Sequence, residues 1–236
     1  WEELSKADGA DSLTIRALLH ENAVAFVTTA NHISSVQLDS LQFSLNKKML
    51  NRAEEVNNIL KDIVGLNDKM KVIEGYGNHI TANDYKDERN ALLDRLSQLI
   101  PIAYYENSYG EVVVSLHGRD LINGNYFNPV DIKFDEQGYG QIYWSDTGDK
   151  IDLKGLGELG GYIDARDKVV VEYKDRLNIL VGEIAKAVNV IHRTGYDLEG
   201  NKGENFFIVD NIDDVAASIR VNAIMEDFNK IVASSM

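Results

Sequence analysis

The sequence of 236 residues contains no cysteine and only two prolines, Pro101 and Pro129. The absence of cysteine excludes disulfides, thiolate zinc sites, iron–sulfur clusters and cysteine nucleophiles, and it leaves the compartment open. The first hundred residues lack proline and therefore the strongest helix breaker. Long uninterrupted helices are thus permitted in that part of the chain.

Basic residues are also scarce, because 24 Lys and Arg stand against 38 Asp and Glu, for a net charge of −14. This charge repels phosphate backbones and anionic lipid headgroups, so we expect neither nucleic acid nor a membrane as a partner. No run approaches the roughly 20 apolar residues of a membrane span, and no signal-peptide pattern opens the chain. Because the sequence starts at Trp1 and ends at Met236 without a closing signal, we expect a soluble fragment of a longer protein.

Apolar residues at intervals of three or four predict long helices in the first hundred residues. One helix is expected over 12–33 behind the N-cap Asp11-Ser12, and a longer one of about 33 residues over 41–73. Asn83-Asp84 restart a shorter helix that Pro101 stops. We therefore predict a long-helix segment over residues 1–101.

The region after Pro101 has a different composition, with ten of the 18 glycines and six of the 11 tyrosines in 102–161. Short β-rich runs alternate with turns and predict strands over 111–116, 131–134, 141–144 and 150–153. A helical period returns over 158–192, followed by short strands at 206–209 and 219–221 and a terminal helix over 226–232. The expected fold is α+β: an elongated bundle of long antiparallel helices with a small antiparallel β module at 102–155 and a helical remainder at 156–236.

Three short motifs point to chemistry that their context does not support. Gly155, Gly157 and Gly160 satisfy G-x-G-x-x-G, but the long helix that follows leaves no room for a Rossmann unit, and Glu158 would oppose a pyrophosphate. The triplet at 146–148 matches aspartic proteases but lies in a polar run typical of a turn. The acidic loop 197–204 lacks the EF-hand order, although spacing alone leaves an ion there undecided.

No two of the five histidines lie three or four residues apart, so the sequence contains no helical metal pair, and each is expected at a surface or helix end. We therefore expect no catalytic residue, no cofactor and no metal ligand. Arg89 and Arg166 each stand beside acidic residues on a helix. They either belong to a solvated charged face or pair with a carboxylate of another helix and so determine helix register.

A more specific signal lies in residues 157–167, followed by 189–192, Gly195-Tyr196-Asp197, Gly200, Gly203 and Phe206-Phe207. This pattern resembles the family of flagellar hook-associated protein 1, the first hook–filament junction protein. Further similarities lie at 11–16, 66–67, 87–93 and 109–112, so the resemblance covers nearly the whole chain. The chain departs from the family at Ser12, Glu88 and Asn90, and it lacks the family's terminal heptad segments and the second β insertion found in many members.

The resemblance implies a structural subunit of the bacterial flagellum, located outside the cell, that joins hook to filament by protein–protein packing. It implies as partners the hook protein, the second junction protein and other copies of the full-length protein, with an export chaperone at the missing C-terminal region. This fragment alone is then expected to be monomeric. The alternatives are another axial protein, such as flagellin or the second junction protein, and a nucleotide-binding enzyme.

Overall fold

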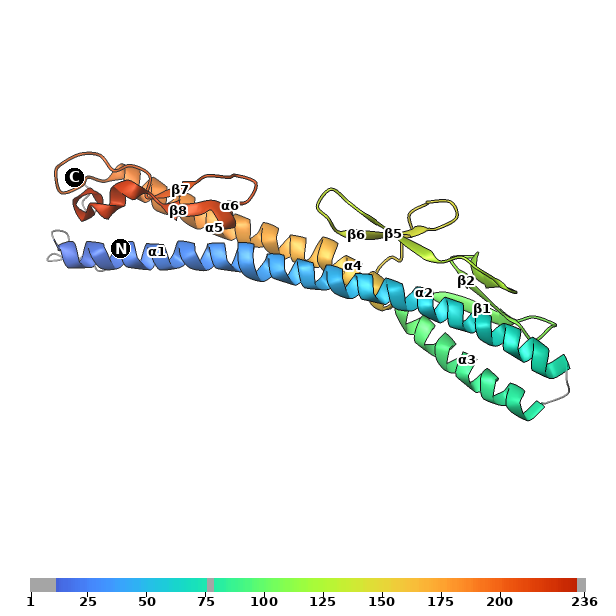
Figure 1. The fold of residues 1–236 in the computed structure, drawn as a ribbon. Helices are drawn as coiled ribbons and strands as arrows, with labels where there is room; N and C mark the ends of the chain where they lie inside the picture. The colour runs from blue at the N-terminus through green and yellow to red at the C-terminus, as the bar shows by residue number, and fades with distance from the viewer. Residues whose placement is uncertain (1–11, 76–78, 233–236) are drawn as a thin grey trace. The chain divides into compact units, whose positions relative to one another are not determined.

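The computed structural model describes residues 12–75 and 79–232 (Figure 1). Its contacts divide the chain into two compact units. Unit 1 combines the described residues of Trp1–Leu41 and Val170–Met236, and unit 2 is Gln42–Val169. No helix in the described ranges combines the length and apolar character needed to cross a membrane.

Helical structure covers nearly all of the described residues up to Leu99. Ser12 caps the first helix, since its hydroxyl accepts a hydrogen bond from the backbone of Ile15; Asp11 lies outside the described residues. The two helices predicted over 12–33 and 41–73 are joined by a π-helical segment, which the apolar spacing did not reveal. The elements are α1 (Leu13–His32), the π-helix η1 (Ile33–Leu38), α2 (Asp39–Gly75) and α3 (His79–Leu99).

Unit 2 contains two antiparallel sheets between its helices. The first has the order β1-β2-β3-β4, and the second is the hairpin β5-β6. Residues 150–153, predicted as a strand, form only an isolated bridge at Lys150, and strands β1, β3 and β4 were missed. The strands are β1 (Ile102–Glu106), β2 (Val112–Leu116), β3 (Arg119–Asn123), β4 (Tyr126–Phe127), β5 (Val130–Phe134) and β6 (Gly140–Trp144).

The strands of unit 2 do not have a hydrophobic core of their own. Buried residues of α2 such as Leu60, of α3 such as Leu96 and of β2 such as Val114 belong to one cluster. The predicted boundary at 101/102 is therefore a change of secondary structure within one core, because strands this short bury an apolar face only by packing on helices. The segments predicted at 1–101, 102–155 and 156–236 differ from the two observed units.

Beyond the sheets, unit 2 closes with α4 (Gly157–Asp164) and the π-helix η2 (Ala165–Val169), and unit 1 resumes with α5 (Val170–Thr194). In unit 1 both predicted short strands are present, as β7 (Phe207–Val209) and β8 (Ile219–Val221), and they pair antiparallel. Between them lies the short helix α6 (Val215–Ser218). The predicted terminal helix is instead two 3-10 turns, η3 (Ala223–Glu226) and η4 (Phe228–Lys230).

Candidate functional site

Asparagine side chains attach the sheets of unit 2 to helix α2. The amide of Asn67 donates to the carbonyl of Val112 at 3.2 Å, and its oxygen accepts from the N–H of Val112 at 3.2 Å. Asn57 makes the same pair of bonds with Val130, both at 2.9 Å. Each asparagine thus satisfies both backbone groups of a strand residue, which would be costly to bury without partners.

Arg89 of α3 is buried and binds three different segments. Its guanidinium donates to Asn67 Oδ1 at 3.1 Å, to the carbonyl of Gly110 at 2.9 Å and to Glu106 Oε2 at 2.7 Å. The carboxylate partner lies on strand β1, whereas the contact with another helix goes through the amide of Asn67. Arg89 therefore links α3, α2 and the first hairpin.

Arg166 of η2 is fully buried and has a similar set of partners. It donates to Asn46 Oδ1 of α2 at 2.6 Å and to the carbonyl of Gly140 at 3.0 Å. Its carboxylate partner is the adjacent Asp167, at 2.6 and 2.9 Å, and the guanidinium lies 5.1 Å from the ring of Tyr139.

Neither sequence interpretation of the two arginines is correct. Both side chains are buried, so they do not form a solvated charged face. Nor does either arginine pair with a carboxylate of another helix, since Arg89 pairs with a carboxylate on strand β1 and Arg166 with that of the adjacent residue. Both arginines do contact helix α2, but through the amide oxygens of Asn67 and Asn46. A neutral amide can accept from a guanidinium and still hold a strand, which a sequence search for charge pairs overlooks.

The glycines of the G-x-G-x-x-G motif allow close backbone packing. A Cβ on Gly157 would overlap the carbonyl of Leu99 at the end of α3, and one on Gly160 would meet the backbone of Gly155. Gly155 and Gly157 also have positive φ values of 72° and 68°. The interpretation of these glycines as a close helix start is confirmed.

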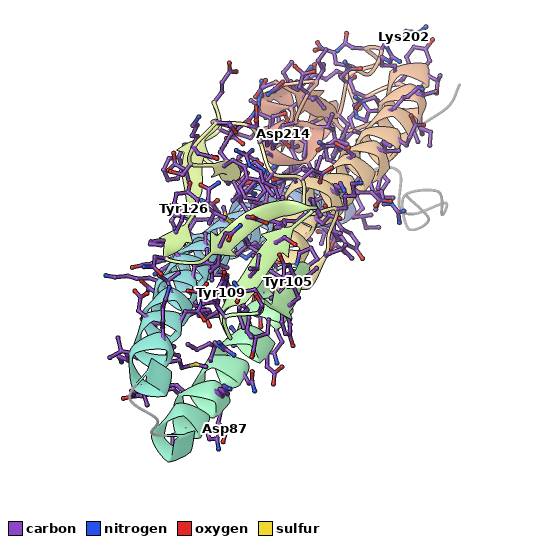
Figure 2. All side chains as sticks on the ribbon, turned by 90° about the vertical axis from the view of Figure 1, so that its right-hand side faces the viewer. Asp87, Tyr105, Tyr109, Tyr126, Lys202 and Asp214 are labelled. Atoms are coloured by element: carbon purple, nitrogen blue, oxygen red, sulfur yellow. The ribbon has the colours of Figure 1, made fainter. Side chains whose placement is uncertain are left out.

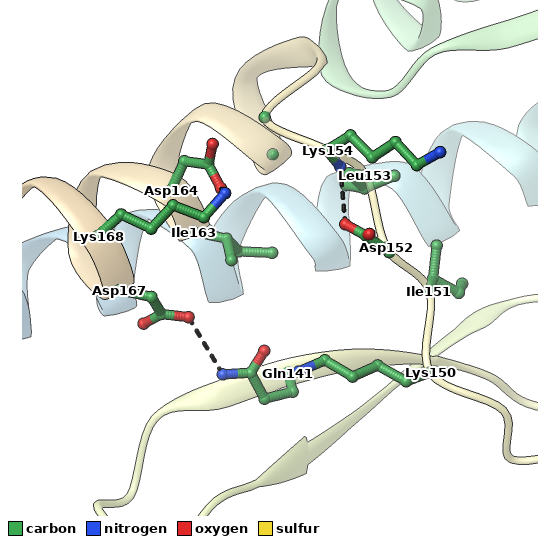
Figure 3. A pocket seen from close by; sticks show the side chains of 12 residues that line it. Gln141, Lys150, Ile151, Asp152, Leu153, Lys154, Ile163, Asp164, Asp167 and Lys168 are labelled. Atoms are coloured by element: carbon green, nitrogen blue, oxygen red, sulfur yellow. Dashed lines mark hydrogen bonds and ion pairs between the residues drawn. The ribbon is translucent and has the colours of Figure 1, made fainter.

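A pocket of about 380 Å³ in unit 2 adjoins these glycines. Its rim combines Asp164 paired with Lys168 at 2.7 Å and Gln141 donating to Asp167 at 3.3 Å (Figure 3). Burial, the largest single influence, raises the pKa of Asp167, but the hydrogen bonds and charge of Arg166, the hydrogen bond from Gln141 and the charge of Lys150 together outweigh burial and lower this pKa. Asp164, Lys168 and Asp167 are thus already engaged by other side chains of this unit.

The N-terminus of α4, where a dinucleotide phosphate would bind, already carries Glu158. This carboxylate accepts from Arg95 at 2.6 Å and pairs with Arg52 at 2.8 Å. The hydrogen bond from Arg95 lowers the pKa of Glu158. The favourable end of the helix dipole is therefore occupied by a side chain of this chain itself.

The protease-like triplet forms a turn, as the sequence indicated. Gly148 has a φ of 74°, its N–H donates to the carbonyl of Trp144 at 2.8 Å, and Asp146 pairs with Arg119 at 2.6 Å. Across the described ranges, no group of three or more His, Asp and Glu side chains is placed to hold a metal ion.

The residues at 189–207 that carry the family resemblance meet at one end of α5. Asn189 binds both backbone groups of Phe207, at 2.8 and 2.9 Å. In the loop after α5, Asp197 accepts from the N–H groups of Glu199 and Asn201. Burial, the largest single influence, raises the pKa of Asp197, but these N–H donors, the side-chain amide of Asn201 and the charge of Lys230 together outweigh burial and lower it. The loop is an ordered turn.

His192 lies in the same place, in the last turn of α5, so it is at a helix end as one of the two expectations had it, but it is not at the surface. Its ring is fully buried beside Phe206, at 5.3 Å between ring centres. A Cβ on Gly203 would overlap the carbonyl of His192, so this loop glycine permits the close approach. Of the other histidines, His32 and His117 are exposed, His20 is half-buried, and the side chain of His79 lies outside the described residues.

Helix α5 also exposes a row of apolar side chains, here called the apolar stripe. Tyr173, Leu180 and Ile191 are 60%, 58% and 54% exposed. A groove of about 280 Å³ opens between this row and Ile33 and Leu38 of η1, inside unit 1. Members of the stripe follow one another at intervals of three or four residues: Tyr173, Leu177, Leu180, Ile184, Ala187 and Ile191.

A second exposed surface lies on the four-stranded sheet of unit 2. Tyr105 pairs in register with Val113 and Tyr126 with Asn123, and Figure 2 labels both tyrosines together with Tyr109 of the β1-β2 turn. All three tyrosines are exposed. Exposed aromatic groups of this kind are typical of surfaces that contact other proteins.

These features define a domain of long helices on which small β sheets are fixed by buried amide and guanidinium groups. The model of the flagellar hook-associated protein FlgK helical domain matches residues 1–207, and the chain belongs to this family. It is 26% identical over 164 residues to flagellar hook-associated protein 1 of Escherichia coli, covering 66% of this chain and 30% of the relative. For the Bacillus subtilis protein of that name the identity is 25% over 238 residues, covering 88% and 46%.

Among solved structures, the flagellar hook junction protein FlgK of Burkholderia pseudomallei has the same fold, with a TM-score of 0.71 at 22% identity. The similarity covers 86% of this chain and 38% of that one. The chain thus spans about a third to a half of the curated relatives it matches.

Proposed function

We propose that this chain is a structural part of the bacterial flagellar hook–filament junction, where it joins hook to filament by protein–protein packing. Membership of the FlgK helical-domain family supports this role. The structural observation that carries it is the apolar stripe of α5, which extends over five turns of helix. Apart from Leu177, which is partly buried against the core of unit 1, its members are exposed in the part of the chain that the structure describes.

The stripe has the spacing of a helix–helix contact. Apolar residues at alternating intervals of three and four form a seam that gains stability when a second helix covers it. The groove beside Leu177 and Leu180, with Ile33 on its other wall, offers a seat for such a helix. We assign as occupant a helix from the part of the full-length protein that lies outside this chain, since the relatives are more than twice as long.

The lack of cysteine makes this assignment simple to test. Leu180→Cys is introduced into this chain and into the full-length protein, and the rate of maleimide labelling at that position is followed by peptide mass spectrometry. We expect fast labelling in the chain alone and slow labelling in the full-length protein. Glu183→Cys, at an exposed site of the same helix, is the matched control and should label quickly in both. Equal rates for Leu180→Cys in the two proteins would refute the occupant.

The role at the junction is tested in the cell. Full-length protein carrying Leu180→Glu should leave hooks without attached filaments under the electron microscope, whereas Glu183→Gln should support normal filaments. The proposed partners are the hook protein, the second junction protein and further copies of the full-length protein, with an export chaperone for its C-terminal region. The proposed location is the extracellular flagellum. Normal filaments in cells that lack the protein altogether would overturn the proposal.

We also propose that the chain has no catalytic activity and binds no nucleotide. The three glycines of the fingerprint serve backbone packing, and Glu158 occupies the helix end where a phosphate would bind. Because any ligand selective for the native state raises the melting temperature, added dinucleotides should leave it unchanged.

A further inference from the structure

The imidazole of His192 connects three segments of unit 1. Its Nε2 lies 3.0 Å from the backbone nitrogen of Val232, near the described end of the chain. Its Nδ1 lies 2.6 Å from the carbonyl oxygen of Glu204 in the loop that follows α5. One ring on α5 therefore holds both the loop and the C-terminal segment, here defined as residues 223–232.

The two partners determine the protonation state of this ring. A backbone N–H can only donate, so Nε2 must accept with its lone pair, and a carbonyl can only accept, so Nδ1 must carry the hydrogen. Both contacts are satisfied only by the neutral Nδ1–H tautomer. A proton added at Nε2 would replace the acceptor by a donor that faces the N–H of Val232.

The surroundings also disfavour a charged ring. Burial lowers the pKa of His192, the carbonyl of Glu204 acts in the opposite direction, and the positive charge of Arg16 on α1 lowers it further. Charged side chains on the loop and on η4 include Asp197 and Lys230, which lie 3.6 Å from each other. A second histidine, His20 of α1, lies beside the C-terminal segment: the centre of its ring is 5.7 Å from that of the Phe228 ring.

We propose that His192 is an acid-sensitive latch, which holds the C-terminal segment on the end of α5 at neutral pH and releases it when the imidazole is protonated. The closed form excludes the proton and the released form accepts it. The equilibrium for release therefore rises as the pH falls below about 6.5, the value of a free histidine, by up to tenfold per pH unit. The rise stops once the pH reaches the lower pKa of the closed form.

Hydrogen exchange measures this release directly. Protection factors of the backbone amides in 223–232, corrected for the intrinsic pH dependence of exchange, are compared at pH 7.5 and 5.5 by mass spectrometry on the whole chain. In the unchanged protein we expect protection to fall by up to about tenfold between the two values. His192→Gln cannot titrate, so its protection should be the same at both pH values. His20→Gln, the matched control, should keep the fall seen in the unchanged protein.

Three results would overturn the latch: a protection factor in the unchanged chain that does not depend on pH, the same fall in His192→Gln, or loss of the fall in His20→Gln. If His192→Gln does not fold, nitrogen NMR of the imidazole in the unchanged chain decides instead. The neutral Nδ1–H tautomer at pH 7.5, with signals of 223–232 that change as the ring protonates, supports the latch. A charged ring at pH 7.5 refutes it.

Discussion

Replacement of Arg166 by alanine tests whether buried amide and guanidinium groups hold unit 2 together. The substitution removes the donors to Asn46 Oδ1, to the carbonyl of Gly140 and to Asp167. It also removes the cation above the ring of Tyr139 and leaves a cavity where the side chain was fully buried.

The magnitude depends on which of the lost partners water can reach. The Asp167 side chain is 32% exposed, so water recovers most of its hydrogen bonding. The carbonyl of Gly140 and the amide oxygen of Asn46 are buried, although Asn46 keeps the N–H of Gly140 as a donor at 3.0 Å. Breaking a buried charged contact costs about 3–5 kcal/mol, and the partial exposure of Asp167 places this case near 3 kcal/mol.

The measurement is urea unfolding followed by the fluorescence of Trp144, which is buried in unit 2, in a Trp1→Phe background. Arg176→Ala is the matched control, because its ion pair with Glu172 is exposed and should be worth under about 0.5 kcal/mol. A double-mutant cycle with Asn46→Ala should show a coupling above about 1 kcal/mol. A loss below about 0.5 kcal/mol for Arg166→Ala would refute the reasoning.

Four further outcomes are expected. Gly157→Ala should destabilise unit 2 by more than about 2 kcal/mol in urea, because its Cβ overlaps a backbone carbonyl, whereas Gly161→Ala has open space and should be neutral or stabilising. Asn67→Ala should lower the free energy of unfolding by about 2–3 kcal/mol, because it strands both buried backbone groups of Val112; an unchanged urea midpoint would contradict this. Replacing 102–154 by a short linker should abolish the cooperative melt of unit 2 and leave that of unit 1, because the strands share one core with α2 and α3. Sedimentation of the chain at moderate salt should show one species of monomer mass, helped by its net charge of −14, and a tight oligomer would be inconsistent with this.

The sequence by itself determined most of the helical elements, the positions of several strands and the family. Apolar spacing of three and four residues is a local signal, so it located α1 and α2 closely, whereas the single helix predicted over 158–192 corresponds to α4, the π-helix η2 and α5 together. Turn chemistry likewise identified the turns around Gly148 and Asp197. Short strands such as β1, whose side chains are mostly exposed, carry no alternation and were missed.

The tertiary structure alone decided which polar groups are buried and which apolar groups are left uncovered. The partners of Arg166 lie 120 and 26 residues away in the sequence, and no local pattern pairs a guanidinium with an amide or a carbonyl. The bonds of His192 to Glu204 and Val232 likewise span 12 and 40 residues. The periodicity over 158–192 predicted a helix with an apolar face, but only packing shows that Leu180 is exposed, since periodicity indicates that a face is apolar and not what covers it.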